Sequence, residues 1–315
     1  MKKALKIFGI ILLVLIALYL LSIPYLRSKN VVKETMFYTP TKYDNKNIFN
    51  QLDEKYLTHI KKDSIVFVAN KFISSTKEDS VKLNQTVLKR NFQRFEKNSN
   101  SEFYTITPKV YKKTGIYMLG NQFNIFNMLD DLTELSKKDS VKIYVIVYNG
   151  NGYSKGDSNF STQFKINQKF FEYVKSSNSV DFVIGHSLGT VFATKLATDN
   201  KIPKLALLAP ASNIDDVADY FKGIAPFWAK PYFNFSEIKK SEFAKVGNSS
   251  ENIKNYNGNL ILSHGTKDEN LPFSMSEKIY KNSKSEDKIL IKIENGDHYA
   301  PLVGENWTNL MNKLK

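Results

Sequence analysis

From about residue 101 to the end of the chain, short apolar runs alternate with longer amphipathic stretches. Short apolar runs predict strands at 115–119, 141–148, 180–184, 204–209, 259–263 and 289–294. Amphipathic stretches between them predict helices near 124–136, 161–176 and 188–199. Strands that alternate with helices are typical of βαβ units, so we expect an α/β fold with a mostly parallel central sheet flanked by helices.

Two other regions have a less regular pattern. Residues 29–100 contain an amphipathic helical stretch at 48–60, a possible strand at 64–69 and a second helical pattern around 87–95. Residues 212–258 separate two predicted core strands, so we expect them to form a short cap, too small for a separate domain. No internal repeat or long linker interrupts the chain, which favours one domain over residues 29–315.

The N-terminus carries an uncharged, almost wholly apolar stretch from residue 7 to 26, preceded by Lys2, Lys3 and Lys6. A helix needs roughly 20 such residues to cross a bilayer. A cleavable signal peptide is the alternative, but residues 22–27 hold no Ala-x-Ala site. We therefore predict a single-pass membrane anchor, residues 1–28. The lysines before the span favour a cytoplasmic N-terminus and an extracytoplasmic domain. The preference is weak, because Arg27, Lys29 and Lys33 also place positive charge after the span.

Residues 185–189, Gly-His-Ser-Leu-Gly, fit the G-x-S-x-G pattern between a predicted strand and a predicted helix. Strand, sharp turn and helix form the setting of a nucleophile elbow, in which the serine hydroxyl stands clear of the sheet. Glycines at both ends avoid collisions across so tight a turn. Ser187 is therefore the candidate nucleophile.

A serine hydroxyl needs a base, and histidine is the usual one near neutral pH. The chain has four histidines, and three of them fit the role poorly: His59 lies in the amphipathic stretch, His186 inside the elbow, and His264 directly before Gly265, where we expect it to shape a turn. His298 remains, in a glycine-containing loop after the last predicted strand. His298 is therefore the candidate base.

The acid of such a triad lies between the serine and the histidine in the chain. Asp268 follows the predicted strand 259–263 and would hold the second ring nitrogen of the base. Glu269 and Asp297 are rivals, but Glu269 is one residue late for the turn. Asp297 adjoins His298, and adjacent side chains rarely meet ring to carboxylate.

Four motifs in order give the chain, over roughly residues 101–315, a resemblance to α/β-hydrolases. They are the segment 117–124, the segment 148–156, the elbow, and the two loops that carry Asp268 and His298; the segment 210–218 is similar as well. Within that superfamily the chain resembles the membrane-anchored BEM46-like and serine aminopeptidase-like hydrolases. Two departures bear on substrate preference: Leu119 replaces the usual histidine of H-G-N-x-x-N, and Asn149 the usual arginine of Y-R-G-x-G-x-S-x-G.

The resemblance implies roles for each residue. Ser187 would be the nucleophile, Asp268 the acid and His298 the base. The backbone N–H of Leu188, with that of Asn121 or Gln122, would form the oxyanion hole. Aromatic residues at 220–235, among them Phe227, Trp228 and Tyr232, would line an acyl pocket, dip toward the bilayer or pack as an ordinary cap.

We therefore expect a serine hydrolase that cleaves an ester or thioester of an apolar acyl group. An amidase or peptidase, an acyltransferase and a non-catalytic binding module on the same scaffold are the alternatives. No His, Cys or carboxylate cluster has metal-ligand spacing, and the segment 148–156 lacks the Gly-Lys-Ser/Thr ending of a phosphate loop, so we predict neither metal nor cofactor.

The net charge of +14 would attract the chain to anionic lipid headgroups. Evenly spread lysines and the lack of a nucleic-acid motif argue against nucleic acid as a partner. With no cysteine, the chain has neither disulfides nor a lipoprotein anchor. The sequence gives no indication of the oligomeric state.

Overall fold

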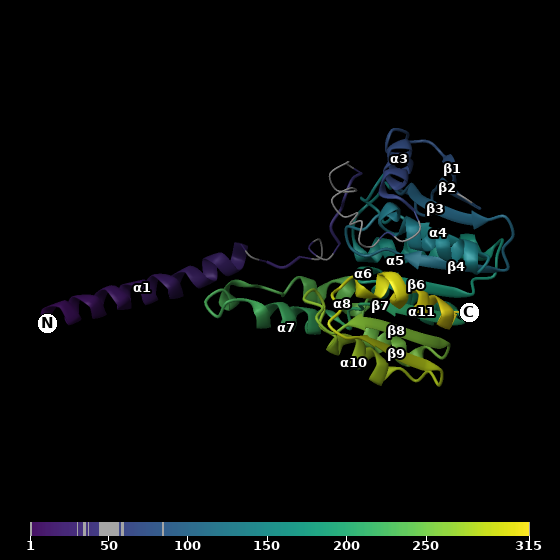
Figure 1. Ribbon diagram of the computed structural model, residues 1–315. Helices are drawn as coiled ribbons and strands as arrows, with labels where there is room; N and C mark the ends of the chain where they lie inside the picture. Colours follow the sequence, from purple (N-terminus) through teal and green to yellow (C-terminus); the bar gives the residue numbers. More distant parts are fainter. Residues whose placement is uncertain are drawn as a thin grey trace.

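A nine-stranded sheet forms the centre of the computed structural model, and one long helix projects away from it (Figure 1). The structure describes residues 2–29, 31–33, 36, 38–43, 57, 60–83 and 85–314, with the side chains of the first helix from Phe8 onward. The described strands are β1 (Asp79–Leu83), β2 (Thr86–Gln93), β3 (Ser101–Pro108), β4 (Lys113–Met118), β5 (Val141–Ile146), β6 (Phe182–His186), β7 (Lys204–Leu208), β8 (Asn259–Gly265) and β9 (Lys288–Ile293).

The strands lie in the order β1-β2-β3-β5-β4-β6-β7-β8-β9. The pairs from β1 to β5 along that order are antiparallel, and every pair from β5–β4 onward is parallel. Parallel strands buried on both faces are continuously apolar, as in β6 and β7. This is the α/β-hydrolase fold that the sequence predicts, with boundaries that differ by a few residues from the expected ones.

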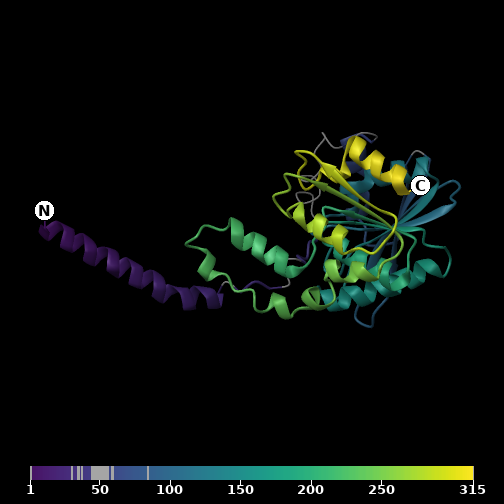
Figure 2. The same ribbon diagram turned by 90° about the horizontal axis from the view of Figure 1, so that it is seen from below.

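Helices cover both faces of the sheet. They are α4 (Leu129–Lys138), α5 (Phe160–Lys175), α6 (Leu188–Asn200), α10 (Ser274–Asn282) and α11 (Gly304–Leu314), with short 3-10 turns at Ile125–Met128 and Ala300–Leu302. Right-handed crossovers put α4 opposite α5 and α6, because the chain reverses its direction along the sheet after β5. Figure 2 shows α11 on one face of the sheet and α5 and α6 on the other.

Two predictions before residue 100 are wrong. The expected strand at 64–69 lies in helix α3 (Lys62–Ile73), whose buried residues recur at helical spacing; they are Ile65, Val68, Ala69 and Phe72. The expected helix at 87–95 is mostly strand β2, in which every second side chain from Thr86 to Arg90 is buried. The buried Arg90 disguised that alternation. The expected helix at 48–60, with His59, lies almost wholly outside the described residues.

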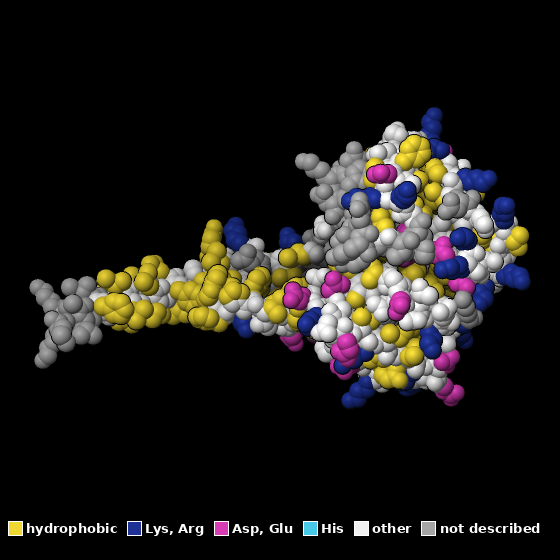
Figure 3. Space-filling view, viewed as in Figure 1, with side chains coloured by type: hydrophobic (Ala, Val, Ile, Leu, Met, Phe, Trp, Pro, Cys, Tyr) yellow, Lys and Arg dark blue, Asp and Glu magenta, His cyan; other side chains and the backbone are white. Residues whose placement is uncertain are grey.

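Helix α1 (Lys2–Lys29) is the projecting helix, and its surface is apolar and exposed (Figure 3). Within the described residues, Phe8–Lys29 is the one helical stretch long and apolar enough to cross a membrane. By length and composition it fits either an anchor or a signal sequence, which leaves the predicted boundary at residue 28 a prediction.

The segment between β7 and β8 contains α7 (Ile214–Ile224), α8 (Glu242–Lys245) and α9 (Ser249–Asn252), with short 3-10 turns at Lys230–Tyr232 (η4), Ile238–Lys240 and Ile253–Asn255. Residues 214–240, which we call the cap arm, extend from the body of the molecule toward α1 (Figures 1 and 2). The arm follows the carboxyl end of β7. The loops of the candidate site follow the carboxyl ends of the parallel strands β6, β8 and β9, on the same side of the sheet.

Candidate active site

Ser187 lies between β6 and α6 with φ 51° and ψ −120°, a conformation that non-glycine residues rarely adopt. Its neighbours leave no space for side chains at the two elbow glycines. A Cβ on Gly185 would lie 2.6 Å from the Gly189 carbonyl oxygen, and one on Gly189 would overlap the carbonyl of Met118 at the end of β4. The elbow is therefore pressed against the neighbouring strand, and the partly exposed Ser187 stands at its apex.

Asp268 and His298 meet at the carboxyl ends of β8 and β9. The Nδ1 atom of His298 lies 2.7 Å from Oδ2 of Asp268. The other oxygen of Asp268 accepts hydrogen bonds from the backbone N–H groups of Asn270 and Leu271, both at 2.8 Å. Both side chains are almost fully buried. The structure therefore brings together the two residues that the sequence paired, although 30 positions separate them.

The hydrogen bonds keep Asp268 ionised. Burial by itself would raise the pKa of this carboxyl, but the donors His264 and His298 outweigh it and hold the pKa below its ordinary range. The Asp268 carboxylate would accordingly favour the tautomer of His298 that carries its proton on Nδ1. That tautomer leaves Nε2 of His298 able to accept a proton.

His264 is a second histidine on Asp268, a contact that sequence reasoning missed. Its Nε2 lies 2.9 Å from Oδ2 of Asp268 and 2.8 Å from the carbonyl oxygen of Leu271, so this nitrogen faces two acceptors and donates. Its Nδ1 lies 2.7 Å from the hydroxyl of Ser276, which then donates to it. These contacts hold the acid turn, as expected for His264. The sequence feature that could have indicated this contact is the four-residue spacing between His264 and Asp268.

The elbow packs against the loop of His298. The Nε2 atom of His186 lies 3.3 Å from the backbone carbonyl oxygen of His298, and the two imidazole rings are 5.0 Å apart. Burial, with the nearby His298, lowers the pKa of His186 to about 3, so its ring is neutral. Among the described residues none forms a hydrogen bond with the Ser187 hydroxyl, which is common before substrate aligns such a pair.

The predicted oxyanion loop lies beside Ser187. Residues 120–123 form a turn closed by the N–H of Phe123 donating to the Gly120 carbonyl, with Gln122 at φ 62°. A Cβ on Gly120 would lie 3.5 Å from the Cβ of Ser187. No described residue accepts a hydrogen bond from the backbone N–H of Leu188, Asn121 or Gln122. These donors are available to a ligand, whereas their role in an oxyanion hole stays a prediction.

Two side chains hold this loop in place. The Asn121 Oδ1 atom accepts a hydrogen bond from the backbone N–H of Thr39 at 3.0 Å. The hydroxyl of Tyr148, two residues after β5, donates to the Leu119 carbonyl at 2.8 Å. Asn149, which replaces the arginine of the family pattern, is fully buried, and its backbone N–H donates to Gln163. Tyr148, at the start of the segment 148–156, thus fixes the residue that precedes the predicted oxyanion loop.

The predicted pocket residues lie elsewhere. Phe227 and Trp228 are exposed in the cap arm, and Tyr232 contacts α1 through Tyr19 and Ser22. No contact in the described structure joins any of the three to Ser187 or His298. Their part in binding substrate stays a prediction.

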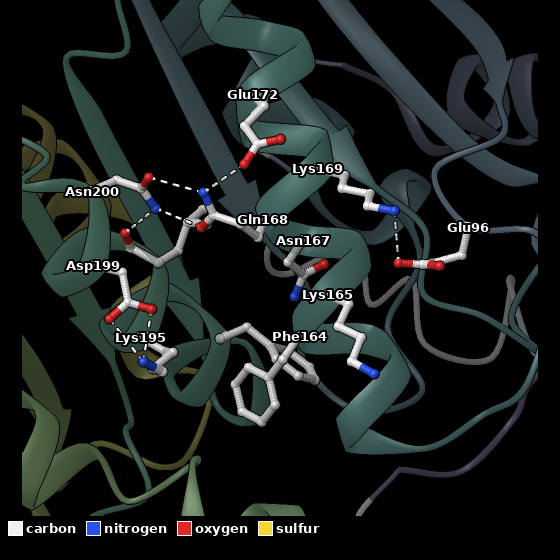
Figure 4. A pocket seen from close by; sticks show the side chains of 12 residues that line it. Glu96, Phe164, Lys165, Asn167, Gln168, Lys169, Glu172, Lys195, Asp199 and Asn200 are labelled. Atoms are coloured by element: carbon white, nitrogen blue, oxygen red, sulfur yellow. Dashed lines mark hydrogen bonds and ion pairs between the residues drawn. The ribbon is translucent and has the colours of Figure 1, made fainter.

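A hollow of about 560 Å³ lies between α5 and α6 (Figure 4). Most of its charged side chains pair with one another, as Lys169 does with Glu96 at 2.9 Å and Lys195 with Asp199 at 2.7 Å. It is lined by the later turns of α6, whereas Ser187 precedes the helix. Within the described residues, no group of three or more potential metal ligands occurs.

The chain matches no protein-family profile. Solved structures with similar folds include esterase Pf2001 from Pyrococcus furiosus, at 15% identity and a TM-score of 0.58, covering 82% of this chain and 96% of that one. Acetyl xylan esterase 1 from Thermoanaerobacterium matches at 15% identity and TM-score 0.55, over 87% and 98% of the two chains. The mouse alpha/beta hydrolase domain-containing protein 10 matches at 18% and 0.52, over 71% and 96%. Such identities show the fold alone, and that fold is the α/β-hydrolase fold.

Proposed function

We propose that this chain is a serine hydrolase that cleaves an ester or thioester of an apolar acyl group. One observation carries the proposal: a strained, partly exposed Ser187 shares one edge of the sheet with a buried His298–Asp268 pair. An inert turn serine has no need of that backbone conformation, and the positive φ costs about 1–3 kcal/mol. Several proteins of similar fold are esterases, which favours an ester over an amide.

The reaction follows from these positions. His298 takes the proton of the Ser187 hydroxyl on Nε2 as the oxygen attacks the acyl carbonyl. The carbonyl oxygen becomes an anion, stabilised by the N–H of Leu188 and of Asn121 or Gln122, and one such donor is worth about 3 kcal/mol. The carbonyl re-forms, the leaving alcohol or thiol departs with the proton from His298, and an acyl-enzyme remains. Water, deprotonated by His298, then releases the acid and restores Ser187.

A membrane anchor would place this chemistry at a bilayer. An uncleaved α1 would hold the domain next to acyl lipids, on the extracytoplasmic side by the distribution of lysines around the span. Placement in the membrane-anchored BEM46-like branch rests on the four sequence motifs and belongs to the same proposal. An amidase or peptidase would use the same three residues, so a substrate panel separates these reactions.

The first test is covalent labelling with a fluorophosphonate and hydrolysis of p-nitrophenyl esters of several acyl lengths, on the full chain in detergent. We expect Ser187→Ala to abolish labelling and to lower turnover by at least about a thousandfold, because it removes the nucleophile. The exposed Ser177 provides the matched control, and Ser177→Ala should label and turn over like the wild type.

Either of two results would contradict the proposal. A folded wild-type chain that neither labels nor turns over would indicate a binding module on a hydrolase scaffold. Labelling that persists in Ser187→Ala would assign the nucleophile to another residue. Product analysis with an added alcohol separates hydrolysis from acyl transfer, because a transferase would form the new ester.

A further inference from the structure

The cap arm is attached to α1 by direct contacts near its tip. The Tyr19 hydroxyl donates to the backbone carbonyl of Trp228 at 2.9 Å, and the Ser22 and Tyr232 hydroxyls are 3.2 Å apart. The rings of Tyr19 and Tyr232 pack edge to face, with centroids 5.7 Å apart. Just after the helix, the Val32 N–H donates to the Asn234 carbonyl at 2.7 Å. These contacts therefore attach the tip of the arm to α1.

The residues of α1 that contact the arm, Tyr19 and Ser22, lie well inside its apolar span. Tyr19 precedes Arg27, the first charged residue after the span, by eight positions, or about 12 Å of helix. Only residues 7–18 precede Tyr19 in the apolar stretch, about 18 Å of helix, against a hydrocarbon thickness of about 30 Å. A membrane span that ended before Tyr19 would be too short to cross the hydrocarbon core. If α1 crosses a bilayer, whatever is bound at Tyr19 enters it too.

The side chains at the tip suit that environment. Its exposed apolar residues are Phe221, Ile224, Phe227, Trp228 and Phe233. Phe227 is 84% exposed, which is unusual for a large aromatic side chain in water. Between Asp219 and Glu237 the sequence has no acidic residue but has Lys222 and Lys230. Aromatic rings with flanking lysines are the composition of segments that enter the boundary between headgroups and acyl chains.

We propose that the tip of the cap arm, residues 221–233, is a second membrane contact that enters the same bilayer as α1. The aromatic side chains lie among the upper acyl chains, and the two lysines reach back to anionic headgroups. Figure 3 shows the apolar surface of α1 continuing toward the body of the molecule, where the arm meets it. The bilayer that receives α1 is thus the occupant of this exposed surface.

This contact orients the molecule. Just before the tip, the Tyr220 hydroxyl donates to the carbonyl of Glu269, in the loop that carries Asp268, at 2.6 Å. In the proposed orientation, the carboxyl ends of the strands, where Ser187 and His298 lie, are on the membrane side of the sheet. For the proposed hydrolase, that orientation favours acyl chains delivered from the bilayer; the membrane contact itself does not rest on the catalytic proposal.

The test uses tryptophan emission of the full chain in vesicles of phosphatidylcholine and phosphatidylglycerol, with and without brominated acyl chains. The chain has two tryptophans, Trp228 and the buried Trp307. We expect brominated lipid to quench the wild type and to leave the remaining emission of Trp228→Phe unchanged. In the Trp228→Phe background, Leu13→Trp reports insertion of α1. Val110→Trp, at an exposed position in the loop between β3 and β4, reports a surface that stays in water.

Three results would overturn the proposal. The first is quenching at position 13 with Trp228 unquenched by lipid and open to aqueous iodide, which would leave the arm in water. The second is Trp228 shielded from iodide but unaffected by brominated lipid, which would indicate a second copy or another protein surface as the occupant. The third is no quenching at position 13, which would show that α1 itself does not enter the bilayer.

Discussion

Burial and hydrogen bonding set the charge of each ionisable group near Ser187. Burial keeps His186 neutral, with its pKa lowered to about 3, and no described residue accepts or donates at its Nδ1. Two histidine donors keep Asp268 ionised. One buried negative charge therefore faces His298, and the neutral His186 adds no positive charge beside the nucleophile.

The neutral His186 makes stability depend on pH. In the unfolded chain its pKa is near 6.5, so between pH 6.5 and 3 the unfolded state binds more protons, and stability falls as pH falls, by up to about 1.4 kcal/mol per pH unit. From pH 6.5 to 4.5 we expect the wild type to lose about 2 kcal/mol more than His186→Asn, which has no titratable ring at this position. Urea unfolding at both pH values measures the difference.

Asp268 does not interfere in that window. Its pKa is lowered in the folded state, so its stabilising contribution is fully present above its ordinary pKa of about 3.9 and is lost only as pH falls below that. Parallel stability curves for the wild type and His186→Asn would show that His186 is protonated in the folded protein.

At the scale of elements, the strand–turn–helix unit of the elbow depends on close backbone approach. β6 and α6 meet β4 so closely that Gly189 lies against the Met118 carbonyl, and Gly185 against the Gly189 carbonyl. A side chain at either place would push α6 away from the sheet. The elbow geometry is thus enforced by neighbouring backbone, which cannot rotate out of the way as a flexible side chain can.

Gly189→Ala should therefore destabilise the chain by at least about 2 kcal/mol, because its Cβ overlaps backbone. Gly223 in α7 is the matched control, since a Cβ there meets nothing within 4 Å. Gly223→Ala should stabilise by up to about 1 kcal/mol through helix propensity. Chemical unfolding of both variants checks the pair. Equal effects at the two sites would contradict the steric account of the elbow.

At the scale of the whole molecule, Arg90 attaches the N-terminal region to the sheet. Its fully buried guanidinium donates to the carbonyl of Phe72 at 2.5 Å, and to those of Ser75 and Lys77 at 2.6 Å each. It also lies 3.8 Å from the carboxylate of Glu102 on β3. One side chain thus joins the end of α3, the following loop and two strands.

Arg90→Met should lower the free energy of unfolding by about 3–5 kcal/mol. The variant leaves Glu102 as a buried charge without a cation and leaves three backbone carbonyls without their hydrogen-bond donor. The double variant Arg90→Met/Glu102→Gln should recover part of that loss, since the buried charge is gone. Arg94, which is exposed on the same segment, is the control, and Arg94→Met should stay within about 0.5 kcal/mol. Unfolding free energies that rank the three variants differently would refute the role of Arg90 as an anchor.

Several features of this protein depend on local chemistry and can be predicted from the amino-acid sequence. The apolar runs of β4 to β9, the glycines around Ser187 and the apolar length of α1 can be identified without a partner, because sterics and hydrophobicity act within a few residues. The order Ser187, Asp268, His298 also came from the sequence. The residues lie where that order predicts, and their roles as nucleophile, acid and base stay predictions.

The remaining features depend on contacts between distant segments of the chain. The apolar run at 65–68 became helix α3 because one side packs on the core, and β2 became a strand although Arg90 occupies its inward face. The second histidine on Asp268, the packing of His186 on the loop of His298 and the attachment of the cap arm to α1 all join distant segments. Local patterns do not encode which distant surfaces meet, because that choice depends on the packing of the whole chain.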